Sequence, residues 1–400
     1  MNSNCHRELC EFLQQQIEAS PQKRITFAQY MDWVLYHPLY GYYASHHPKI
    51  GASGDFFTAV HLGSDFGELL AEQFVQMWEI LEHPQPFTLV EMGAGQGLLA
   101  ADILSFLQKK YPDFFQVLDY IIIEKSYQFQ TEQRFQLQNR INSEYQVQWC
   151  NWDSIPLNSI TGCCFSNELV DAFPVHQVVF EGEQLQEVYV TNTSDQSSNS
   201  GGFEEIIAPL STPELSTYFQ TLGFDFSSNR YPEPYRTEVN LEAIKWIETV
   251  ASKLHRGFLL TIDYGYSTEK YYSPTRQAGS LQCYFQHRYH NNPYINIGHQ
   301  DLTAHINFTA LEYWCKQAGL EPVGFTQQAL FLMALGLSDR LNTLYQTDNL
   351  PLKEVLQCRE ALHRLINPMG LGNFGVLVQS KGLQEYQPIQ LKGLIVPELG

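Results

Sequence analysis

The chain has 400 residues, of which 44% are hydrophobic and 14% aromatic, and its formal net charge is -19 at pH 7. This length is more than one small core requires, so we expect a main domain with insertions or a second lobe. Phosphate binding needs a basic face and none is visible, which argues against a nucleic-acid partner. The charge would suit a basic protein segment as partner, although excess acidic residues also simply maintain solubility.

The cysteines and the N-terminus bear on the compartment. The eight cysteines include no C-x-x-C pair, and several lie in apolar runs: Cys5, Cys10, Cys150, Cys163, Cys164, Cys283, Cys315 and Cys358. We therefore predict buried thiols in a reducing compartment rather than a disulfide framework or a zinc site. No apolar stretch has the length of a membrane span. The N-terminus resembles neither a secretory signal nor a typical organellar presequence. These features predict a soluble, cytoplasmic protein.

The first elements of the chain are helical. Residues 6–18 have a helical pattern, and a second helix is expected to start at Thr26 and to end at Pro38. A strongly amphipathic helix over 65–81 leads to a first strand near Phe87.

The run Leu89 to Gly97 (LVEMGAGQG) is the most informative stretch, because glycine recurs at every second position: Gly93, Gly95 and Gly97. A strand, a glycine turn and a helix let a nucleotide-like ligand approach bare backbone at a helix N-terminus. The spacing differs from the dinucleotide fingerprint G-x-G-x-x-G, and Glu91 precedes the turn. Because S-adenosylmethionine carries an amino acid and a sulfonium but no pyrophosphate, this pattern favours it as the ligand. A glycine turn without a ligand is the alternative.

Polar residues also follow the next expected strands. Glu124 ends the run 120–123, where it is placed to hold ribose hydroxyls or is a solvated strand end. Trp152 and Asp153 follow the run 147–149 and are candidates to stack on an adenine face and bond its edge, with Trp152 equally suited to a core position. Asn167 follows a further strand. These polar strand ends place one ligand along the carboxyl edge of a parallel sheet.

The rest of the chain completes an α/β prediction. It comprises a hairpin around 181–183, a loop over 191–202, a helix at 241–254, a strand at 257–262, a helix capped by Thr309, helices at 329–346 and 351–366, and a strand at 375–379. The four parts are an N-terminal helical arm with cofactor-covering loops (1–64), a Rossmann-like core (65–180), an inserted hairpin and loop (181–240), and the remainder of the core (241–400). Helices are expected on both faces of the sheet.

Residues 267–308 are polar and aromatic, which is typical of a lid over a cleft. They contain four histidines, His287, His290, His299 and His305. The spacings between these residues match no helical ligand pair, so we predict no metal site.

With these motifs placed, the chain resembles the MidA family of class I methyltransferases, whose mitochondrial members act as arginine methyltransferases in the assembly of respiratory complex I. The resemblance covers nearly the whole chain. It is carried by Pro38-Leu39-Tyr40-Gly41-Tyr42-Tyr43, Gly54-Asp55-Phe56-Phe57-Thr58, Phe66-Gly67-Glu68-Leu69, the glycine turn, Asn167-Glu168 with Asp171-Ala172-Phe173-Pro174-Val175-His176, Asp263-Tyr264-Gly265, the run Gly298 to Phe308 and Asn367-Pro368-Met369-Gly370 to Phe374.

The chain departs from the family pattern at three places. Thr-Ser-Pro-Glu is usual after Gly-Asp-Phe, but here Thr58 leads into Ala59-Val60-His61. The turn usually carries proline and arginine, where this chain has Ala94 and Gln96, and the commonly aromatic pair after Asn-Glu is Leu169-Val170. Cofactor binding should survive, because it rests on backbone and on Glu91 and Glu124. The altered positions are expected to face the acceptor cleft.

The resemblance implies a protein substrate with an exposed arginine segment, such as a subunit of a respiratory-type NADH dehydrogenase complex. An arginine guanidinium stays protonated, with a pKa above about 12. Glu168 is the candidate to orient it by a bidentate pair, and Asp171 is the candidate to assist or to accept the departing proton. In the alternative, Asn167 and Asp171 cap the following turn and only Glu168 is functional.

By the same resemblance, Asp55 and Thr58 are expected to cover the cofactor together with Tyr40 and Tyr42. Asp263 ends a strand and is expected to support the site from behind. Contacts to the protein substrate are expected from Tyr40, Tyr42, His299 and Asp301, with packing or a lid-stabilising network as the alternative.

Three other functions stay open. They are a small-molecule methyltransferase on the same fold, a cofactor-binding assembly factor without catalysis, and a nicotinamide dehydrogenase, which the glycine spacing disfavours. No oligomeric state is predicted.

Overall fold

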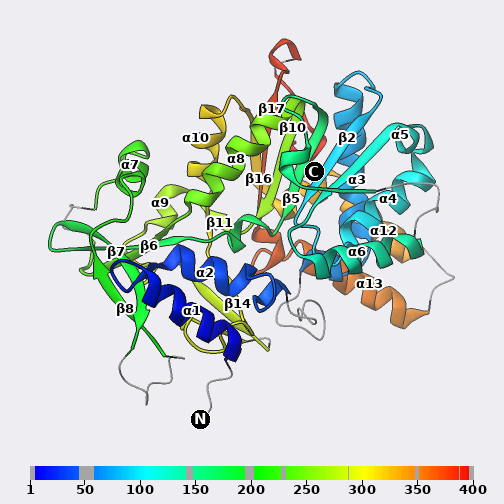
Figure 1. The fold of residues 1–400 in the computed structure, drawn as a ribbon. Helices are drawn as coiled ribbons and strands as arrows, with labels where there is room; N and C mark the ends of the chain where they lie inside the picture. The colour runs from blue at the N-terminus through cyan, green and yellow to red at the C-terminus, as the bar shows by residue number, and fades with distance from the viewer. Residues whose placement is uncertain are drawn as a thin grey trace. The chain divides into compact units, whose positions relative to one another are not determined.

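The computed structural model describes residues 5–44, 58–140, 147–193, 202–226, 231–286, 288–346, 351–386 and 388–395. The chain forms two compact units (Figure 1). Unit 1 comprises Met1–Phe57, Val170–Trp246 and Gly265–Leu311, and unit 2 comprises Thr58–Leu169, Ile247–Tyr264 and Glu312–Gly400.

A seven-stranded sheet forms the centre of unit 2. Its strand order is β16-β17-β10-β5-β2-β3-β4. The strands are β2 (Phe87–Met92), β3 (Leu118–Ile123), β4 (Gln148–Cys150), β5 (Ile160–Asn167), β10 (Leu254–Asp263), β16 (Glu321–Gln327) and β17 (Gly375–Lys381). The strands from β4 to β10 are parallel, and β17 is antiparallel to both β10 and β16. This arrangement confirms the predicted α/β fold with a mainly parallel central sheet.

Helices cover this sheet, and its central strands are therefore buried. All six residues of β2 are buried, as expected for a strand inside a covered parallel sheet. Helix α3 (Asp65–Ile80), predicted over 65–81, contributes Phe66, Phe74 and Met77 to the core. The other helices with residues in unit 2 are α4 (Leu98–Lys110), α5 (Pro112–Val117), α6 (Tyr127–Arg140), α8 (Leu241–Lys253), α10 (Phe308–Gln317), α11 (Gln328–Ala334), α12 (Leu337–Gln346) and α13 (Leu352–Leu365).

Unit 1 contains the predicted N-terminal helices, α1 (Arg7–Ala19) and α2 (Phe27–Tyr36). Thr26 caps α2 through a capping box with Gln29, as its place before an apolar run predicts. Further helices are the short α7 (Glu214–Thr221) and α9 (Thr268–Tyr271).

An antiparallel sheet completes the core of unit 1. Its path is β1-β7-β6-β9, and β8 pairs with β7. The strands are β1 (Ile25–Thr26), β6 (His176–Glu181), β7 (Gln184–Asn192), β8 (Phe203–Ala208) and β9 (Tyr235–Val239). The hairpin predicted around 181–183 is confirmed, with positive φ angles at Gly182 (58°) and Glu183 (60°). Of the loop predicted over 191–202, residues 194–201 lie outside the described residues.

The segment 267–308 has more regular structure than its sequence predicts. Strand β12 (Gln282–Phe285) pairs antiparallel with β13 (Arg288–His290) and β14 (Asp301–Thr303), and β11 (Gly265–Tyr266) pairs with β15 (Ile306–Asn307). Strands of two to four residues are too short to give a periodic pattern.

Two helix boundaries and one strand differ from the predictions. Helix α10 starts at Phe308, and Asn307 rather than Thr309 accepts a hydrogen bond from the third residue, Ala310 N. The helix predicted over 329–346 is broken into α11 and α12 at Gly336, whose φ is 108°. Strand β16, at the sheet edge, was not predicted, because Pro322 and Gly324 interrupt its pattern.

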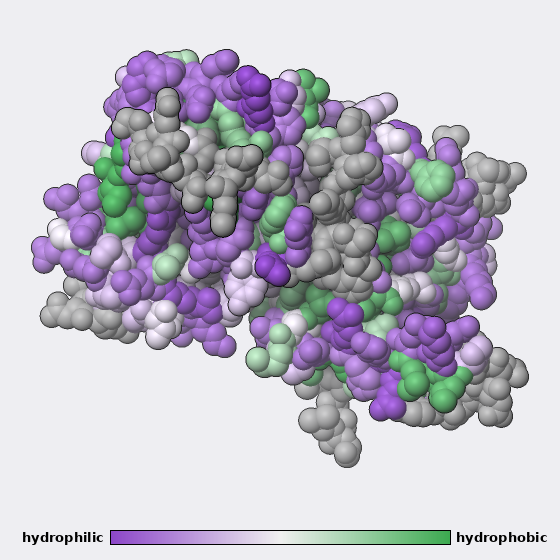
Figure 2. Space-filling model, turned by 90° about the horizontal axis from the view of Figure 1, so that it is seen from below, coloured by the Kyte–Doolittle hydropathy of each residue, from purple (hydrophilic) through white to green (hydrophobic). Residues whose placement is uncertain are grey.

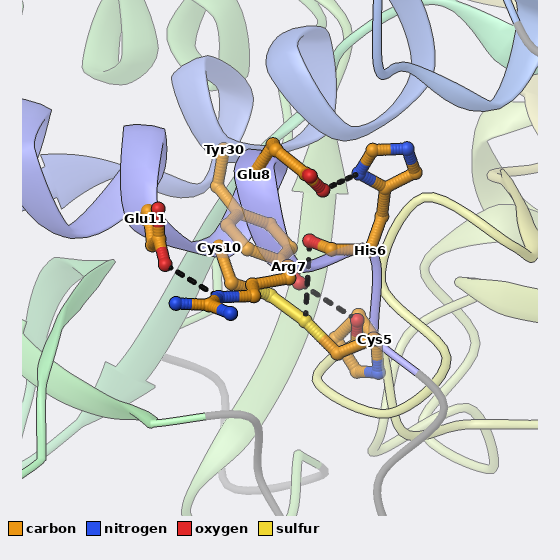
Figure 3. The surroundings of a disulfide bond; sticks show 8 residues. Cys5, His6, Arg7, Glu8, Cys10, Glu11 and Tyr30 are labelled. Atoms are coloured by element: carbon orange, nitrogen blue, oxygen red, sulfur yellow. Dashed lines mark hydrogen bonds and ion pairs between the residues drawn. A yellow bond between two sulfur atoms is a disulfide. The ribbon is translucent and has the colours of Figure 1, made fainter.

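The predicted absence of disulfides is wrong for Cys5 and Cys10. They form a disulfide in unit 1 with their Cα atoms 7.0 Å apart, and Figure 3 shows the bond beside Tyr30. The two cysteines are five residues apart, at the start of α1, so no distant pairing was needed. Cys163, Cys164, Cys283 and Cys315 are buried free thiols, as predicted, whereas Cys150 is half-buried and Cys358 is exposed.

The surface agrees with the acidic, polar composition. The face drawn in Figure 2 is mostly hydrophilic, with apolar residues exposed in small areas. Across the described ranges, no helix is both long enough and apolar enough to cross a bilayer.

Gly162 allows the central strands of unit 2 to approach closely. It pairs with Thr88 of β2 on one side and with Gly257 of β10 on the other. A Cβ atom at Gly162 would lie 2.0 Å from the carbonyl oxygen of Thr88. We expect Gly162→Ala to lower the free energy of unfolding by more than about 2 kcal/mol, because the sheet must open to admit the methyl group.

Urea denaturation of the purified chain measures this change. Gly319→Ala is the matched control in the same unit, since Gly319 also has a positive φ (83°) but no heavy atom within 4 Å of a Cβ. It should cost only about 1 kcal/mol of backbone strain. Equal losses in the two variants would contradict the packing argument.

Candidate active site

The carboxyl ends of the parallel strands bring the predicted polar residues to one edge of the unit 2 sheet. Met92 of β2 pairs with Ser166 of β5 and with Ile123 of β3, and Ile123 in turn pairs with Cys150 of β4. The residues that follow these strand ends are therefore neighbours across the sheet.

The glycine turn, residues 93–97, joins β2 to α4. The φ angles of Gly93, Gly95 and Gly97 are 71°, 52° and 80°, a left-handed region that favours glycine. A Cβ atom at Gly93 would lie 2.7 Å from Leu169 Cδ1, and one at Gly97 would lie 2.9 Å from Gln133 Cα. At Gly95 a Cβ would meet no heavy atom within 4 Å. The outer glycines therefore permit close packing, while the middle one leaves bare backbone facing open space.

Glu91 lies inside the sheet just before the turn. Only 3% of its surface is exposed, and the hydroxyl of Tyr120 donates to its Oε2 at 2.7 Å. Burial raises the pKa of Glu91 to about 7, although the hydrogen bond from Tyr120 acts in the opposite direction. Part of the Glu91 population is therefore protonated at neutral pH.

Glu124 follows β3. Its carboxylate accepts hydrogen bonds from Ser126 N at 2.8 Å and from Gln133 Nε2 at 3.2 Å. Burial raises its pKa to about 7 as well, against the effect of these donors.

Gln133 of α6 is a site residue that the sequence analysis missed. It is fully buried, its Nε2 also donates to Gly95 O at 2.8 Å, and its Oε1 accepts from Trp149 Nε1 at 2.8 Å. It therefore connects the glycine turn, Glu124 and β4. A polar residue midway between Phe129 and Leu137, the buried apolar residues one helical turn away on either side, was the available signal.

The end of β4 carries the predicted aromatic and acidic residues. Trp152 is half-buried and Asp153 is exposed, both in a short turn after the strand. Trp149 packs against the hydrophobic core, and the guanidinium carbon of Arg134 lies 3.8 Å from its ring centroid.

At the end of β5, two buried oxygen atoms have no hydrogen-bond partner within the described ranges. They are Ser166 Oγ and Asn167 Oδ1. The amide of Asn167 donates to Glu168 Oε1 at 3.2 Å. Because buried polar atoms in proteins nearly always have partners, these two oxygens fit a polar ligand at this edge.

Glu168 has a positive φ of 53°, which is uncommon for a residue other than glycine. Its backbone N donates to Ile262 O of β10 at 2.9 Å, which fixes this conformation. Such backbone strain is concentrated at functional sites. Asp263, at the end of β10, is fully buried, and its Oδ1 accepts from Tyr264 N at 2.8 Å.

Asp171 belongs to unit 1, where its backbone oxygen accepts a hydrogen bond from Ala304 N at 2.9 Å. In the same unit, the buried Asp301 accepts from the hydroxyl of Tyr43 at 2.9 Å. Burial is the main cause that raises the pKa of Tyr43, followed by the charge of Asp301 and then smaller effects that include Asp171. Tyr43 was not predicted as a site residue, although it ends a quoted motif.

The remaining predicted residues of unit 1 make ring contacts. Tyr40 stacks on His37 with 4.9 Å between ring centroids, Tyr42 is buried against Tyr43, and the ring of His299 lies 5.7 Å from that of His6.

The last predictions to compare with the structure are the cofactor-covering residues Asp55 and Thr58 and the absence of a metal site. Thr58 is buried beside His61 in unit 2, and Asp55 lies outside the described residues. In the parts of the chain that the structure describes, no group of three or more His, Cys, Asp or Glu side chains could hold a metal ion.

Comparison with known proteins identifies the family. Residues 69–326 match the model of the family described as "Putative S-adenosyl-L-methionine-dependent methyltransferase". A Burkholderia thailandensis protein crystallised with bound S-adenosyl-homocysteine is 29% identical, with a TM-score of 0.84, over 97% of this chain and 94% of that chain.

Curated relatives include mitochondrial protein arginine methyltransferases. The NDUFAF7 homolog of Drosophila melanogaster is 27% identical over 80% of this chain and 73% of its own length. NDUFAF7 of Homo sapiens is 28% identical over 90% of this chain and 81% of its own length.

The chain belongs to this family of S-adenosyl-L-methionine-dependent methyltransferases, and S-adenosylmethionine is its cofactor. The predicted cytoplasmic location is wrong by this comparison, because these curated relatives are named as mitochondrial proteins. That prediction rested on the cysteines, the apolar stretches and the N-terminal residues, and these features together carried too little information about the compartment.

The raised pKa of Glu91 has a consequence for stability. Its ordinary value is 4.5 and its folded value is about 7, so the folded state holds the proton more tightly. The associated stability is fully present below about pH 4.5 and is lost as the pH rises to about 7. Glu91→Gln, which stays neutral, should therefore gain stability relative to the parent chain between pH 5 and pH 8, by up to about 3 kcal/mol.

Chemical denaturation of both proteins without cofactor, at pH 5 and pH 8, gives the two differences. The glutamine retains an oxygen that can accept from the Tyr120 hydroxyl. A difference between the proteins that is the same at both pH values would show that Glu91 titrates normally.

Proposed function

We propose that the carboxyl edge of the unit 2 sheet holds S-adenosylmethionine and that the chain uses it to methylate an arginine side chain of a protein. Two kinds of observation support the cofactor position. The first is the open space at Gly95, and the second is the pair of buried side-chain oxygens on Ser166 and Asn167. When bound, the cofactor supplies an electrophilic methyl group on a sulfonium.

Individual residues have distinct parts in this proposal. Glu124 binds the ribose hydroxyls, and Trp152 with Asp153 contacts the adenine. Gly93, Gly95 and Gly97 present backbone to the amino-acid end, while Asn167 and Thr58 complete the polar surroundings. Glu91 lies beneath the turn, so its proposed effect is electrostatic: an ionised Glu91 favours a cationic ligand nearby.

The protein arginine acceptor is supported by the names of the curated relatives. It is also supported by the position of Glu168, a carboxylate held by strained backbone at the strand end. A carboxylate that pairs with two guanidinium nitrogens fixes the plane of the group and draws positive charge away from the third. We assign this part to Glu168. Asp171, from the segment that follows, is assigned to assist it or to accept the departing proton.

The family resemblance suggests a subunit of a respiratory-type NADH dehydrogenase complex as the acceptor. Tyr40, Tyr42, His299 and Asp301 of unit 1 are the residues proposed to contact it. The net charge of -19 suits an arginine-bearing segment as substrate, because attraction between opposite charges raises the rate of association.

Cofactor binding should release protons if Glu124 binds the ribose. Hydroxyl donors stabilise the ionised carboxylate, so the pKa of Glu124 should fall from about 7 when the cofactor binds. At pH 6.5 we expect proton release, measured by titration calorimetry with S-adenosyl-homocysteine in two buffers of different ionisation enthalpy. Glu124→Gln should lose most of this release and bind at least about tenfold more weakly.

Asp119→Asn is the matched control, because Asp119 lies at the opposite end of the same strand and also has a raised pKa. Its proton release and affinity should equal those of the parent chain. Unchanged proton release in Glu124→Gln would remove Glu124 from the ribose site.

Glu168→Gln should abolish methyl transfer without loss of cofactor affinity. The neutral amide cannot form a charged bidentate pair with a guanidinium, so we expect the rate to fall at least about a hundredfold. The measurement uses labelled S-adenosylmethionine with a mitochondrial extract, followed by mass spectrometry for methylarginine.

Glu183→Gln is the control, since Glu183 also has a positive φ of 60° but is exposed in the β6–β7 hairpin. Label in small molecules alone would favour the small-molecule methyltransferase. Full activity of Glu168→Gln would exclude the assigned part of Glu168.

A further inference from the structure

A hydrogen bond links the glycine turn to the residues just after Thr58. His61, in the single-turn helix Ala59–His61, has its Nε2 at 3.1 Å from the side-chain Oε1 of Gln96, the fourth residue of the turn. Both partners are half-buried and both belong to unit 2.

The other side of the ring determines the direction of this bond. Thr58 places its hydroxyl 2.8 Å and its backbone N 3.4 Å from Nδ1 of His61. A backbone N can only donate, so Nδ1 is an acceptor and the ring proton lies on Nε2. Nε2 therefore donates to Gln96, and contacts at both ring nitrogens fix the orientation of the imidazole.

This bond adds a side-chain contact to a turn whose backbone is also closed by a hydrogen bond from Gly97 N to Ala94 O at 2.8 Å. Gly93 N donates to Ile123 O at 3.0 Å, and Gly95 O accepts from Gln133. The peptide between Gly95 and Gln96 borders the open space where the cofactor is proposed to lie. Because glycine has wide conformational freedom, fixing Gln96 reduces the number of turn conformations that must be lost when a ligand binds.

We infer that His61 and Gln96 form a positioning pair that holds the glycine turn in its cofactor-binding conformation. Both residues are departures from the family pattern given above, which has glutamate and arginine at these positions. The contact indicates that the two departures are coupled, because their side chains are joined by one hydrogen bond. This inference rests on the proposed cofactor position and is independent of the acceptor.

The direction of the bond distinguishes substitutions at Gln96. Gln96→Glu keeps an acceptor opposite the Nε2 proton and should bind S-adenosyl-homocysteine with the parent affinity or better. Gln96→Arg places a cationic donor opposite a donor and should weaken binding about tenfold. His61→Glu added to Gln96→Arg restores a complementary pair and should recover most of the loss.

Titration calorimetry of the four proteins at pH 8 measures these affinities, and thermal unfolding without ligand checks that each is folded. Gln138→Arg is the charge-matched control on the exposed surface of α6 and should bind like the parent chain. A merely structural contact would lower thermal stability without the donor-dependent order of affinities and without rescue.

Two outcomes overturn the inference: parent affinity in Gln96→Arg, or no recovery in the double variant. Gly95→Val separates this failure from that of the proposed site, because its side chain would enter the open space at Gly95. Loss of binding in Gly95→Val with normal binding in Gln96→Arg removes only the pair. Normal binding in both would remove the proposed cofactor position itself.

Discussion

The cofactor edge depends most on the side chain of Gln133. One buried amide satisfies the carbonyl of Gly95, the carboxylate of Glu124 and the indole of Trp149, which come from three different strand ends. A buried polar group without its partners is costly, so these three segments are held in one arrangement. The close approach of Gly97 to the backbone of Gln133 brings the amide within reach. The turn and Glu124, which is proposed to bind the ribose, are therefore held by the same helix.

The electrostatics of the edge follow from this burial. Glu91 and Glu124 both have a pKa raised to about 7, and the charge of Glu124 contributes to the shift of Glu91. Two carboxylates that resist ionisation are an unfavourable arrangement in the free chain near neutral pH. A cationic sulfonium and two hydroxyl donors favour their ionised forms. In the proposed binding mode, the edge is thus better matched to the cofactor than to water.

The sequence predicted this edge because its signals are local. A strand, a glycine turn and a helix occupy the 24 contiguous residues 87–110, and the acidic residue after the next strand follows the same rule. Gln133 was missed because its partners come from three separate segments, 9 to 38 residues away in the chain. The bond between His61 and Gln96 spans 35 residues and was missed for the same reason.

The short strands β12 to β14 and the edge strand β16 were also beyond sequence reasoning. Their pairing is decided by neighbouring strands rather than by their own periodicity. The disulfide between Cys5 and Cys10 is local, but its sequence signal was outweighed by the apolar setting of other cysteines.

Four of the departures from the family pattern, His61, Ala94, Gln96 and Leu169, share a location that the sequence did not reveal. His61 contacts Gln96 of the turn, Ala94 is part of the hydrophobic core, and Leu169 packs against Gly93. All four lie in unit 2 around the glycine turn. Because the turn is proposed to present backbone rather than side chains to the cofactor, the surrounding side chains can change as a group while the backbone conformation is kept. The contacts behind the turn can therefore differ from the family pattern while the proposed cofactor position is kept.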